Sequence, residues 1–298
     1  MSAPSPASPV GELLAHGRSA VVHAYVGAPP DAPADGADGA EGVGATAGAH
    51  VVKVIEGLSA AEVDQEERNT VLAHRLGLTP IGCHGRVDVA GRPGLVLDRL
   101  TGVCLTTLAE RNILRLREVS RVLADEHARL HAVPVSGFVD VRELAVAQLA
   151  APGLAGLTPA EREEAARLLR ALPAGDRPLH LDFHPQNVFV HGDGYAVVDW
   201  QTACQGAPAA DVAMTKVLFT EAELFPGTAF LKLVLYASVR RVMFGFYLRR
   251  YRAVTGMTDA EIDSWLLAAR VLRAGLLHVP SEQERLLRGI RRDLEASR

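Results

Sequence analysis

The first hundred residues alternate short apolar segments with turn residues, which is the pattern of a small antiparallel sheet. Apolar residues at helical spacing follow in only one stretch, residues 59–76, and Gly77 can end that helix. Strand-like segments occur at residues 11–26 (two strands joined by a turn), 50–55, 85–89 and 94–97. This part of the chain therefore predicts a β-rich unit with a single helix.

Beyond residue 100 the hydrophobic pattern becomes helical. Residues 110–131 carry apolar side chains at steps of three and four, and only residues 188–190 and 195–198 resemble short strands. Helix-start signatures with a hydroxyl residue followed three positions later by glutamate occur at Thr158, Thr258 and Ser281. We expect an α+β fold with a small β-rich N-terminal lobe, residues 1–100, and a larger helical lobe, residues 101–298.

Residues 27–49 differ in kind from their surroundings. They are mostly glycine, alanine and proline with a few acidic residues. Such a segment cannot bury enough apolar surface to offset the entropy lost on ordering. We expect a flexible low-complexity loop between two strands.

Composition and charge exclude several classes of protein. With 31 Lys+Arg and 35 Asp+Glu the net charge is −4, which argues against a nucleic-acid partner. The 3 cysteines form no CxxC pair, so neither a disulfide framework nor a cysteine zinc site is predicted. The N-terminus lacks a secretory signal, and charged residues interrupt the most apolar stretch, 230–247. We expect a cytoplasmic protein without a membrane partner, while its oligomeric state, monomer or dimer, stays open.

The densest polar cluster of the chain lies at residues 180–187, His-Leu-Asp-Phe-His-Pro-Gln-Asn, and a hairpin leads from it to Asp199. The hairpin brings Asp199 back to the end of the loop that carries Asp182 and Asn187. Amide and carboxylate oxygens suit Mg²⁺, which keeps several waters and shares phosphate oxygens. If Asn187 and Asp199 bind the metal, Asp182 is free to accept a proton from a hydroxyl group.

The order H-x-D-x-x-x-x-N followed by a hairpin aspartate resembles the catalytic loop of protein kinases. More specifically, the chain resembles the aminoglycoside phosphotransferase family, protein-kinase-like small-molecule kinases related to choline and homoserine kinases. The usual loop of that family is His-Gly-Asp-Leu-His-Pro-Gly-Asn, followed by Ile-Asp-Trp. The chain departs from it at Leu181, Phe183 and Gln186 and keeps the remaining motif positions, with Trp200 after the metal aspartate. The resemblance implies a bilobal protein-kinase-like fold.

The resemblance also implies a strand lysine that binds the nucleotide phosphates and a helix glutamate that orients it. Lys53 is the only lysine in the first two hundred residues, and it lies inside an apolar strand. A buried ammonium group requires a partner of opposite charge. We expect Glu67 to be this partner, because Val71 and Leu72 follow it as they follow the family's glutamate, and Glu66 is the alternative.

The nucleotide, ATP or GTP, is expected to contact three further positions that the resemblance implies. Ser19 lies in the turn that corresponds to the phosphate-covering loop, although no G-x-G-x-x-G pattern is present. Residues 95–102 correspond to the inter-lobe hinge, where the carbonyl group of Asp98 and the amide group of Leu100 would pair with the base.

The pair His127 and His131 is expected to be structural.

The expected activity is therefore ATP-dependent phosphorylation of a small-molecule hydroxyl group, with Asp182 as the catalytic residue. An aminoglycoside or another antibiotic is a candidate acceptor, and choline, homoserine or sugar-type metabolites are alternatives. A nucleotide-binding pseudokinase is a different class of function that the sequence leaves open. A protein kinase is disfavoured, because no Ala-Pro-Glu segment follows Asp199. A metal-dependent hydrolase that uses His180, Asp182 and His184 is the remaining alternative.

Overall fold

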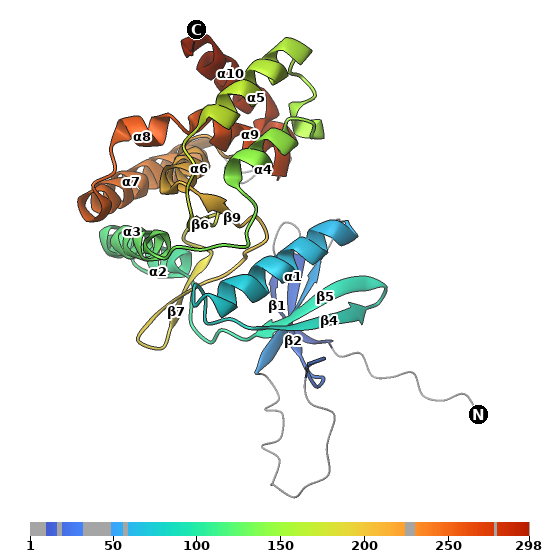
Figure 1. Ribbon diagram of the computed structural model, residues 1–298. Helices are drawn as coiled ribbons and strands as arrows, with labels where there is room; N and C mark the ends of the chain where they lie inside the picture. Colours follow the sequence, from blue (N-terminus) through green and yellow to red (C-terminus); the bar gives the residue numbers. More distant parts are fainter. Residues whose placement is uncertain are drawn as a thin grey trace, which may run out of the picture. The chain divides into compact units, whose positions relative to one another are not determined.

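The structure is a computed structural model that describes residues 10–16, 20–31, 49–55, 59–223, 230–276 and 279–297. It divides into two compact units, which Figure 1 shows coloured along the chain. The first unit contains residues 1–102 together with 196–201, and the second contains residues 103–195 and 202–298. The sequence predicted a single boundary at residue 100. It did not predict that residues 196–201 belong to the first unit.

The first unit contains a five-stranded sheet and one helix. The sheet has the order β1-β2-β3-β5-β4, with all four neighbouring pairs antiparallel. Its elements are β1 (Val10–His16), β2 (Ala20–Tyr25), β3 (His50–Ile55), α1 (Ala60–Arg75), β4 (Cys83–Val89) and β5 (Arg92–Asp98). The sheet-plus-helix arrangement confirms the fold predicted for this part of the chain.

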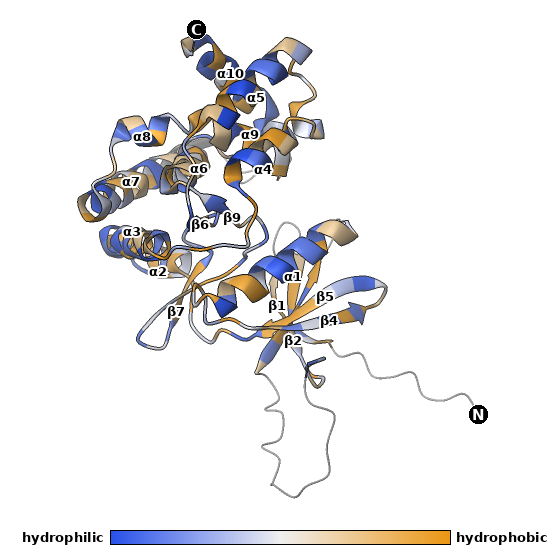
Figure 2. Ribbon diagram, viewed as in Figure 1, coloured by the Kyte–Doolittle hydropathy of each residue, from blue (hydrophilic) through white to orange (hydrophobic). Residues whose placement is uncertain are grey.

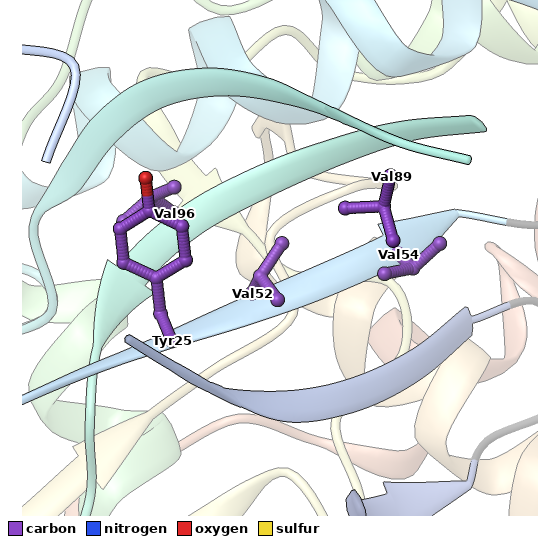
Figure 3. Packing of buried hydrophobic residues seen from close by; sticks show 5 residues of the cluster. All are labelled: Tyr25, Val52, Val54, Val89 and Val96. Carbon is purple, nitrogen blue, oxygen red and sulfur yellow. The ribbon is translucent and has the colours of Figure 1, made fainter. Parts of the chain in front are cut away.

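Alternation along the central strand β3 gives the sheet two different faces. Val52 and Val54 point to one face, where they are fully buried. They belong to an apolar cluster that Figure 3 shows, formed by Tyr25, Val52, Val54, Val89 and Val96. Gly94 on β5 makes room for this packing, since a Cβ atom at that position would lie 2.6 Å from Cγ2 of Val52.

Helix α1 packs on the opposite face of the sheet. Val63 of α1 joins Ile55 and Leu95 in a second buried cluster. A capping box begins the helix, because the Ser59 side chain accepts from the backbone of Glu62, whose side chain accepts from the Ser59 backbone. Figure 2 shows hydrophilic and hydrophobic stretches along the same helix, as expected for a helix with one buried side.

The second unit is mainly helical. Its helices are α2 (Leu105–Arg111), α3 (Leu116–Ala132), α4 (Val141–Gln148), α5 (Pro159–Ala171), α6 (Pro208–Thr220), α7 (Phe230–Thr255), α8 (Asp259–Asp263), α9 (Leu266–Leu276) and α10 (Pro280–Ala296), with 3-10 turns at Ile113–Arg115 and Pro152–Leu154. Two short antiparallel strands, β6 (Arg177–Leu179) and β9 (Cys204–Gly206), pair with each other. Strands β7 (Val188–His191) and β8 (Gly194–Val197) form a hairpin, and the division between the units falls within β8.

The helix-start signatures are confirmed in two of three cases. Thr158 and Thr258 each form a complete capping box. The signature at Ser281 is wrong, because α10 begins at Pro280, and Val279 precedes it without a side-chain cap. The glutamate three positions after Ser281, Glu284, instead accepts a hydrogen bond from Nη1 of Arg288 at 3.3 Å, one turn along the same helix. Ser281 lies inside the first turn of α10, where its hydroxyl group donates to the carboxylate of Glu223, so it is not placed to cap the helix.

Most of the low-complexity segment expected to be flexible, residues 32–48 of 27–49, lies outside the described residues. Among the helices that the structure describes, none combines the length and the apolar character needed to cross a bilayer.

The buried cluster predicts a large difference between two valine positions of the first unit. Val52 is fully buried, whereas Val26 is 60% exposed. Val52→Ala should lower the free energy of unfolding by about 2 kcal/mol, because it removes buried methyl groups and leaves a cavity. The control Val26→Ala should change it by less than about 0.5 kcal/mol. Urea denaturation followed by fluorescence measures both values, and equal losses would contradict the packing described.

Candidate active site

Lys53 lies on the face of the sheet that α1 covers, one residue out of phase with the buried valines. Its Nζ atom donates hydrogen bonds to Oε1 of Glu66 at 2.5 Å and to Oδ1 of Asp199 at 2.9 Å. The Lys53 side chain is only 12% exposed and that of Glu66 only 3%. All three residues belong to the first unit, which holds the segment 196–201. The structure thus surrounds one ammonium group with two carboxylates.

This arrangement keeps Lys53 charged. Burial on its own would lower the pKa of Lys53, but the charges of Asp199 and Glu66 outweigh burial and raise the pKa above its ordinary value. Two carboxylates against one ammonium leave an excess negative charge. Such an excess favours a divalent cation at Asp199, whose side chain is 37% exposed.

The prediction that Glu67 orients Lys53 is wrong, and the alternative, Glu66, is the partner. Glu67 faces β4 instead, where it accepts a hydrogen bond from Nε of Arg86 at 2.5 Å. The physical reason is the buried side of α1, which consists of Val63, Glu66, Asn69, Thr70 and Ala73. Val71 and Leu72, which favoured Glu67, are only partly buried.

Asn69 is a site residue that the sequence analysis missed. Its Nδ2 atom donates to the carbonyl oxygens of Trp200 at 3.1 Å and Gln201 at 3.2 Å. Trp200 is itself buried and donates from Nε1 to the carbonyl oxygen of Val197. These contacts fix the backbone on the C-terminal side of Asp199, which has a φ of 67°, in the left-handed region. The available signal was the spacing of Asn69, which follows Glu66 by three positions and so lies on the same side of the helix.

In the second unit, a fully buried carboxylate holds the backbone that leads to Asp182. Asp211, near the start of α6, accepts hydrogen bonds from the amide groups of His180 at 2.5 Å and Leu181 at 2.9 Å. Thr202 donates from its hydroxyl group to the carbonyl oxygen of His180 at 2.8 Å. Leu181, which stands where the family often has glycine, has a φ of 60°. The turn before Asp182 is therefore left-handed at a residue whose side chain disfavours that conformation.

The histidine pair of α3 buttresses Asp211, in agreement with the expected structural role. The Nε2 atoms of His127 and His131 lie 3.0 Å and 3.4 Å from Oδ2 of Asp211. Their Nδ1 atoms are hydrogen-bonded to the hydroxyl groups of Tyr247 and Tyr251 on α7, each at 2.7 Å. Burial and the neighbouring His131 lower the pKa of His127 to about 4, so that it is neutral at pH 7.

Asp182 and Asn187 lie together in the loop that follows. Nδ2 of Asn187 donates to the backbone oxygen of Asp182 at 3.0 Å and to its Oδ2 atom at 3.3 Å. Nε2 of His184 lies 3.3 Å from the same carboxylate oxygen. Burial would raise the pKa of Asp182, but His184, and after it His180 and Arg273, outweigh burial and hold the pKa at about 2. Asp182 is therefore ionised at neutral pH.

The chemistry of the donors fits magnesium. The amide nitrogen of Asn187 is committed to Asp182, so its carbonyl oxygen is the atom left for a cation. In the part of the chain that the structure describes, no hydrogen bond to that oxygen occurs. Asp199 uses Oδ1 toward Lys53 and has a second carboxylate oxygen. Hard oxygen donors of this kind are the ligands that Mg²⁺ prefers.

The remaining predicted positions have different outcomes. Ser19 lies outside the described residues. Asp98 is the last residue of β5, and Leu100 follows shortly after it, at the end of the first unit. The hydrolase alternative is not supported, because His180, Asp182 and His184 do not form one of the two possible three-ligand metal clusters found among the described residues.

Comparison with known proteins agrees with this geometry. The model of the phosphotransferase enzyme family matches residues 38–244 of the chain. No curated protein sequence matches it. Of the solved structures, aminoglycoside phosphotransferase APH(4)-Ia is similar with a TM-score of 0.58 and 16% identity, over 94% of this chain and 92% of that one. APH(2")-IIa gives a TM-score of 0.50 and 11% identity, over 95% and 92% of the two chains.

The structural neighbours share the kinase-like fold, and at these identities they show the fold alone. The family match covers most of the chain, including Lys53, Asp182, Asn187 and Asp199. It confirms the resemblance that the catalytic-loop motif indicated. The chain therefore belongs to the phosphotransferase enzyme family, and it is an enzyme that transfers a phosphoryl group to the hydroxyl group of a small molecule.

Proposed function

We propose that the protein transfers the γ-phosphoryl group of ATP or GTP to a small-molecule hydroxyl group, with Asp182 as the catalytic residue. The observation that carries this proposal is the ion triad of Lys53, Glu66 and Asp199, in which Lys53 and Glu66 are buried and Asp199 is partly exposed. A strand lysine oriented by a helix glutamate and next to a metal-binding aspartate is the arrangement that kinase-type phosphoryl transfer requires. The proposal assigns the remaining roles to Asp182 and Asn187, which are hydrogen-bonded to each other.

Lys53 binds the phosphates of the nucleotide in this proposal. Its raised pKa keeps it a cation at neutral pH, and Glu66 fixes the direction of the ammonium group. A charge held in place before the nucleotide arrives needs little reorganisation during the reaction. The proposal further assigns Ser19 to the phosphates, and the backbone groups of Asp98 and Leu100 to the nucleotide base.

Asn187 and Asp199 are the proposed magnesium ligands. When bound, the metal neutralises the phosphate oxygens on which negative charge accumulates. Each ligand is already positioned by this chain: Asn187 by its bonds to Asp182, and Asp199 by Lys53. Asn187 presents an oxygen because its nitrogen is occupied.

Asp182 orients the acceptor hydroxyl group and receives its proton. With a pKa of about 2 it is a weak base, so we expect proton transfer only after the bond to phosphorus has largely formed. Its main contribution is to hold the hydroxyl oxygen in line for attack. His184 beside it preserves the negative charge that does this.

The candidate acceptor is an aminoglycoside or another antibiotic. One of the similar structures is a ternary complex of APH(2")-IIa with streptomycin and ATP, which shows both ligands in that protein. Small metabolites such as choline, homoserine or sugars are the second class of acceptor. A pseudokinase would bind nucleotide without transfer, and it is disfavoured because Lys53, Asp182, Asn187 and Asp199 are all present.

A screen for nucleotide turnover tests the proposal directly. With magnesium and either ATP or GTP, ADP or GDP release should rise when one class of hydroxylated compound is added, among aminoglycosides, other antibiotics, amino alcohols and sugars. Mass spectrometry of the acceptor should show the added phosphoryl group. Tight nucleotide binding with no transfer to any compound of the panel would favour the pseudokinase.

Asp182→Asn tests the catalytic role. The change keeps the size of the side chain and removes the negative charge, so kcat should fall by roughly 10²–10⁴-fold. The matched control is Asp176→Asn, at a side chain that is 66% exposed in the same unit. It should keep full activity. Melting temperatures of both variants should equal that of the wild type, and an active, folded Asp182→Asn enzyme would refute the assignment.

The neighbouring glutamates of α1 provide a second matched pair. Glu66→Gln leaves Lys53 with Asp199 alone, so the KM for the nucleotide should rise at least about tenfold, which corresponds to about 1.4 kcal/mol. Glu67→Gln removes a surface partner of Arg86, worth at most about 1 kcal/mol of stability, and should leave the KM nearly unchanged. Steady-state kinetics distinguishes the two variants. The reverse order of effects would show that Glu67 acts on the nucleotide site.

A further inference from the structure

Two histidines and an aspartate meet at the ends of three neighbouring strands of the first unit, and none of them belongs to the ion triad of Lys53. His50 is the first residue of β3, His84 is the second residue of β4 and Asp98 ends β5. These strands are neighbours in the sheet, and His50 is paired with Asp98 in the register of β3 and β5. One ligand atom from each residue lies within 4.8 Å of the other two.

Oδ1 of Asp98 is the centre of this group. It lies 2.8 Å from Nε2 of His84 and 3.9 Å from Nε2 of His50. The other oxygen, Oδ2, accepts the amide hydrogen of Gly82 at 2.7 Å, which fixes the carboxylate. A Cβ atom added at Gly82 would lie 3.0 Å from Oδ2, so a larger residue there would press on the carboxylate. The carboxylate is therefore held with one oxygen toward both imidazole rings.

The ring of His84 is oriented from its other side. Its Nδ1 atom is hydrogen-bonded to Oδ2 of Asp31 at 3.2 Å. Pro30 approaches Gly85 beside it, where an added Cβ atom would lie 3.3 Å from Cβ of Pro30. If Nδ1 carries the proton that Asp31 accepts, the electron pair of Nε2 is available to bind a metal. Proteins usually orient a metal-binding histidine in this way.

The second histidine cluster of the described residues differs from this one. His127, His131 and Asp211 are fully or almost fully buried, and their polar atoms already serve Tyr247, Tyr251 and the catalytic-loop backbone. In contrast, the side chains of His50, His84 and Asp98 are 21%, 24% and 37% exposed. An ion can therefore reach His50, His84 and Asp98 from solvent without disrupting the hydrophobic core.

We propose that His50, His84 and Asp98 form a binding site for a transition-metal ion of the zinc class. The ligands are Nε2 of both histidines and Oδ1 of the aspartate, with water completing the coordination. Two imidazoles and one carboxylate suit zinc or cobalt, whereas magnesium prefers oxygen ligands throughout. When the metal binds, the proton shared between His84 and Asp98 is released to solvent.

This site goes beyond the proposed phosphoryl transfer and is distinct from the magnesium ligands. It would link β3, β4 and β5 at the end of β5, through the side chain of Asp98, whose backbone carbonyl group is assigned to the nucleotide base. Its test needs no nucleotide and no turnover, so its failure and that of the proposed function are distinguishable.

The experiment measures zinc binding by the tag-free, chelator-treated full-length protein, without nucleotide or magnesium. Competition with a chromogenic chelator should give one zinc ion per chain. His50→Gln and His84→Gln should each raise the Kd for zinc at least about tenfold, and Asp31→Asn should raise it roughly tenfold through the orientation of His84. His74→Gln is the matched control, at an exposed histidine on α1 of the same unit, and it should bind zinc as the wild type does.

Two results would overturn the proposal. Wild-type protein that binds no zinc would leave His84 as a hydrogen-bonded bridge between two aspartates. Zinc bound equally well by the His50→Gln/His84→Gln double variant would place the ion elsewhere, with the buried pair of α3 as the next candidate. If a variant does not fold, zinc-induced shifts of the His50 and His84 side-chain NMR signals in the wild-type protein, with His74 unchanged, decide the matter.

Discussion

A buried ammonium group constrains the first unit more than any other single feature. Lys53 lies in the central strand of the sheet, where an unpaired charge would cost several kcal/mol. Its neutralisation requires a carboxylate on the covering helix and another on the segment that returns after the hairpin. The same requirement explains the polar residues on the buried side of α1 and the left-handed backbone at Asp199. Structure and proposed nucleotide binding therefore depend on one set of ion pairs.

The second unit also contains a buried charge that needs partners, but this charge is negative. Here a fully buried carboxylate, Asp211, is stabilised by backbone amide groups and by the two histidines of α3. The amide groups belong to the loop that carries Asp182, so the contacts that stabilise the buried charge also shape that loop. Leu181 adopts the left-handed region at a cost of about 1–2 kcal/mol, which these contacts offset. The left-handed turn before Asp182 is thus formed by a leucine, at a position where the family often has glycine.

Local signals were reliable where neighbours in the sequence make the interaction. The strands and helix of the first unit follow from short-range alternation and spacing, and the capping boxes at Thr158 and Thr258 form within one helical turn. The same signature failed at Ser281, because the helix begins one residue earlier, at Pro280, and the Ser281 hydroxyl group donates to Glu223, a residue far away in the sequence. The local pattern also predicted the wrong partner for Lys53, Glu67 instead of Glu66. The two glutamates are adjacent in the sequence and differ only in which one faces the sheet.

The sequence by itself determined the α+β organisation, the identity of the loop that carries Asp182 and Asn187, and the lone strand lysine. These follow from periodicity and from a motif whose members are close along the chain. Only the tertiary structure decided that Glu66 pairs with Lys53, that Asn69 holds the segment after Asp199, and that the chain returns to the first unit over 196–201. Each of these depends on side chains far apart in sequence. The physical reason is that a buried polar group pairs with the residues on the helix side that faces the sheet. Which side faces the sheet depends on the packing of the whole unit and not on neighbouring residues in the sequence.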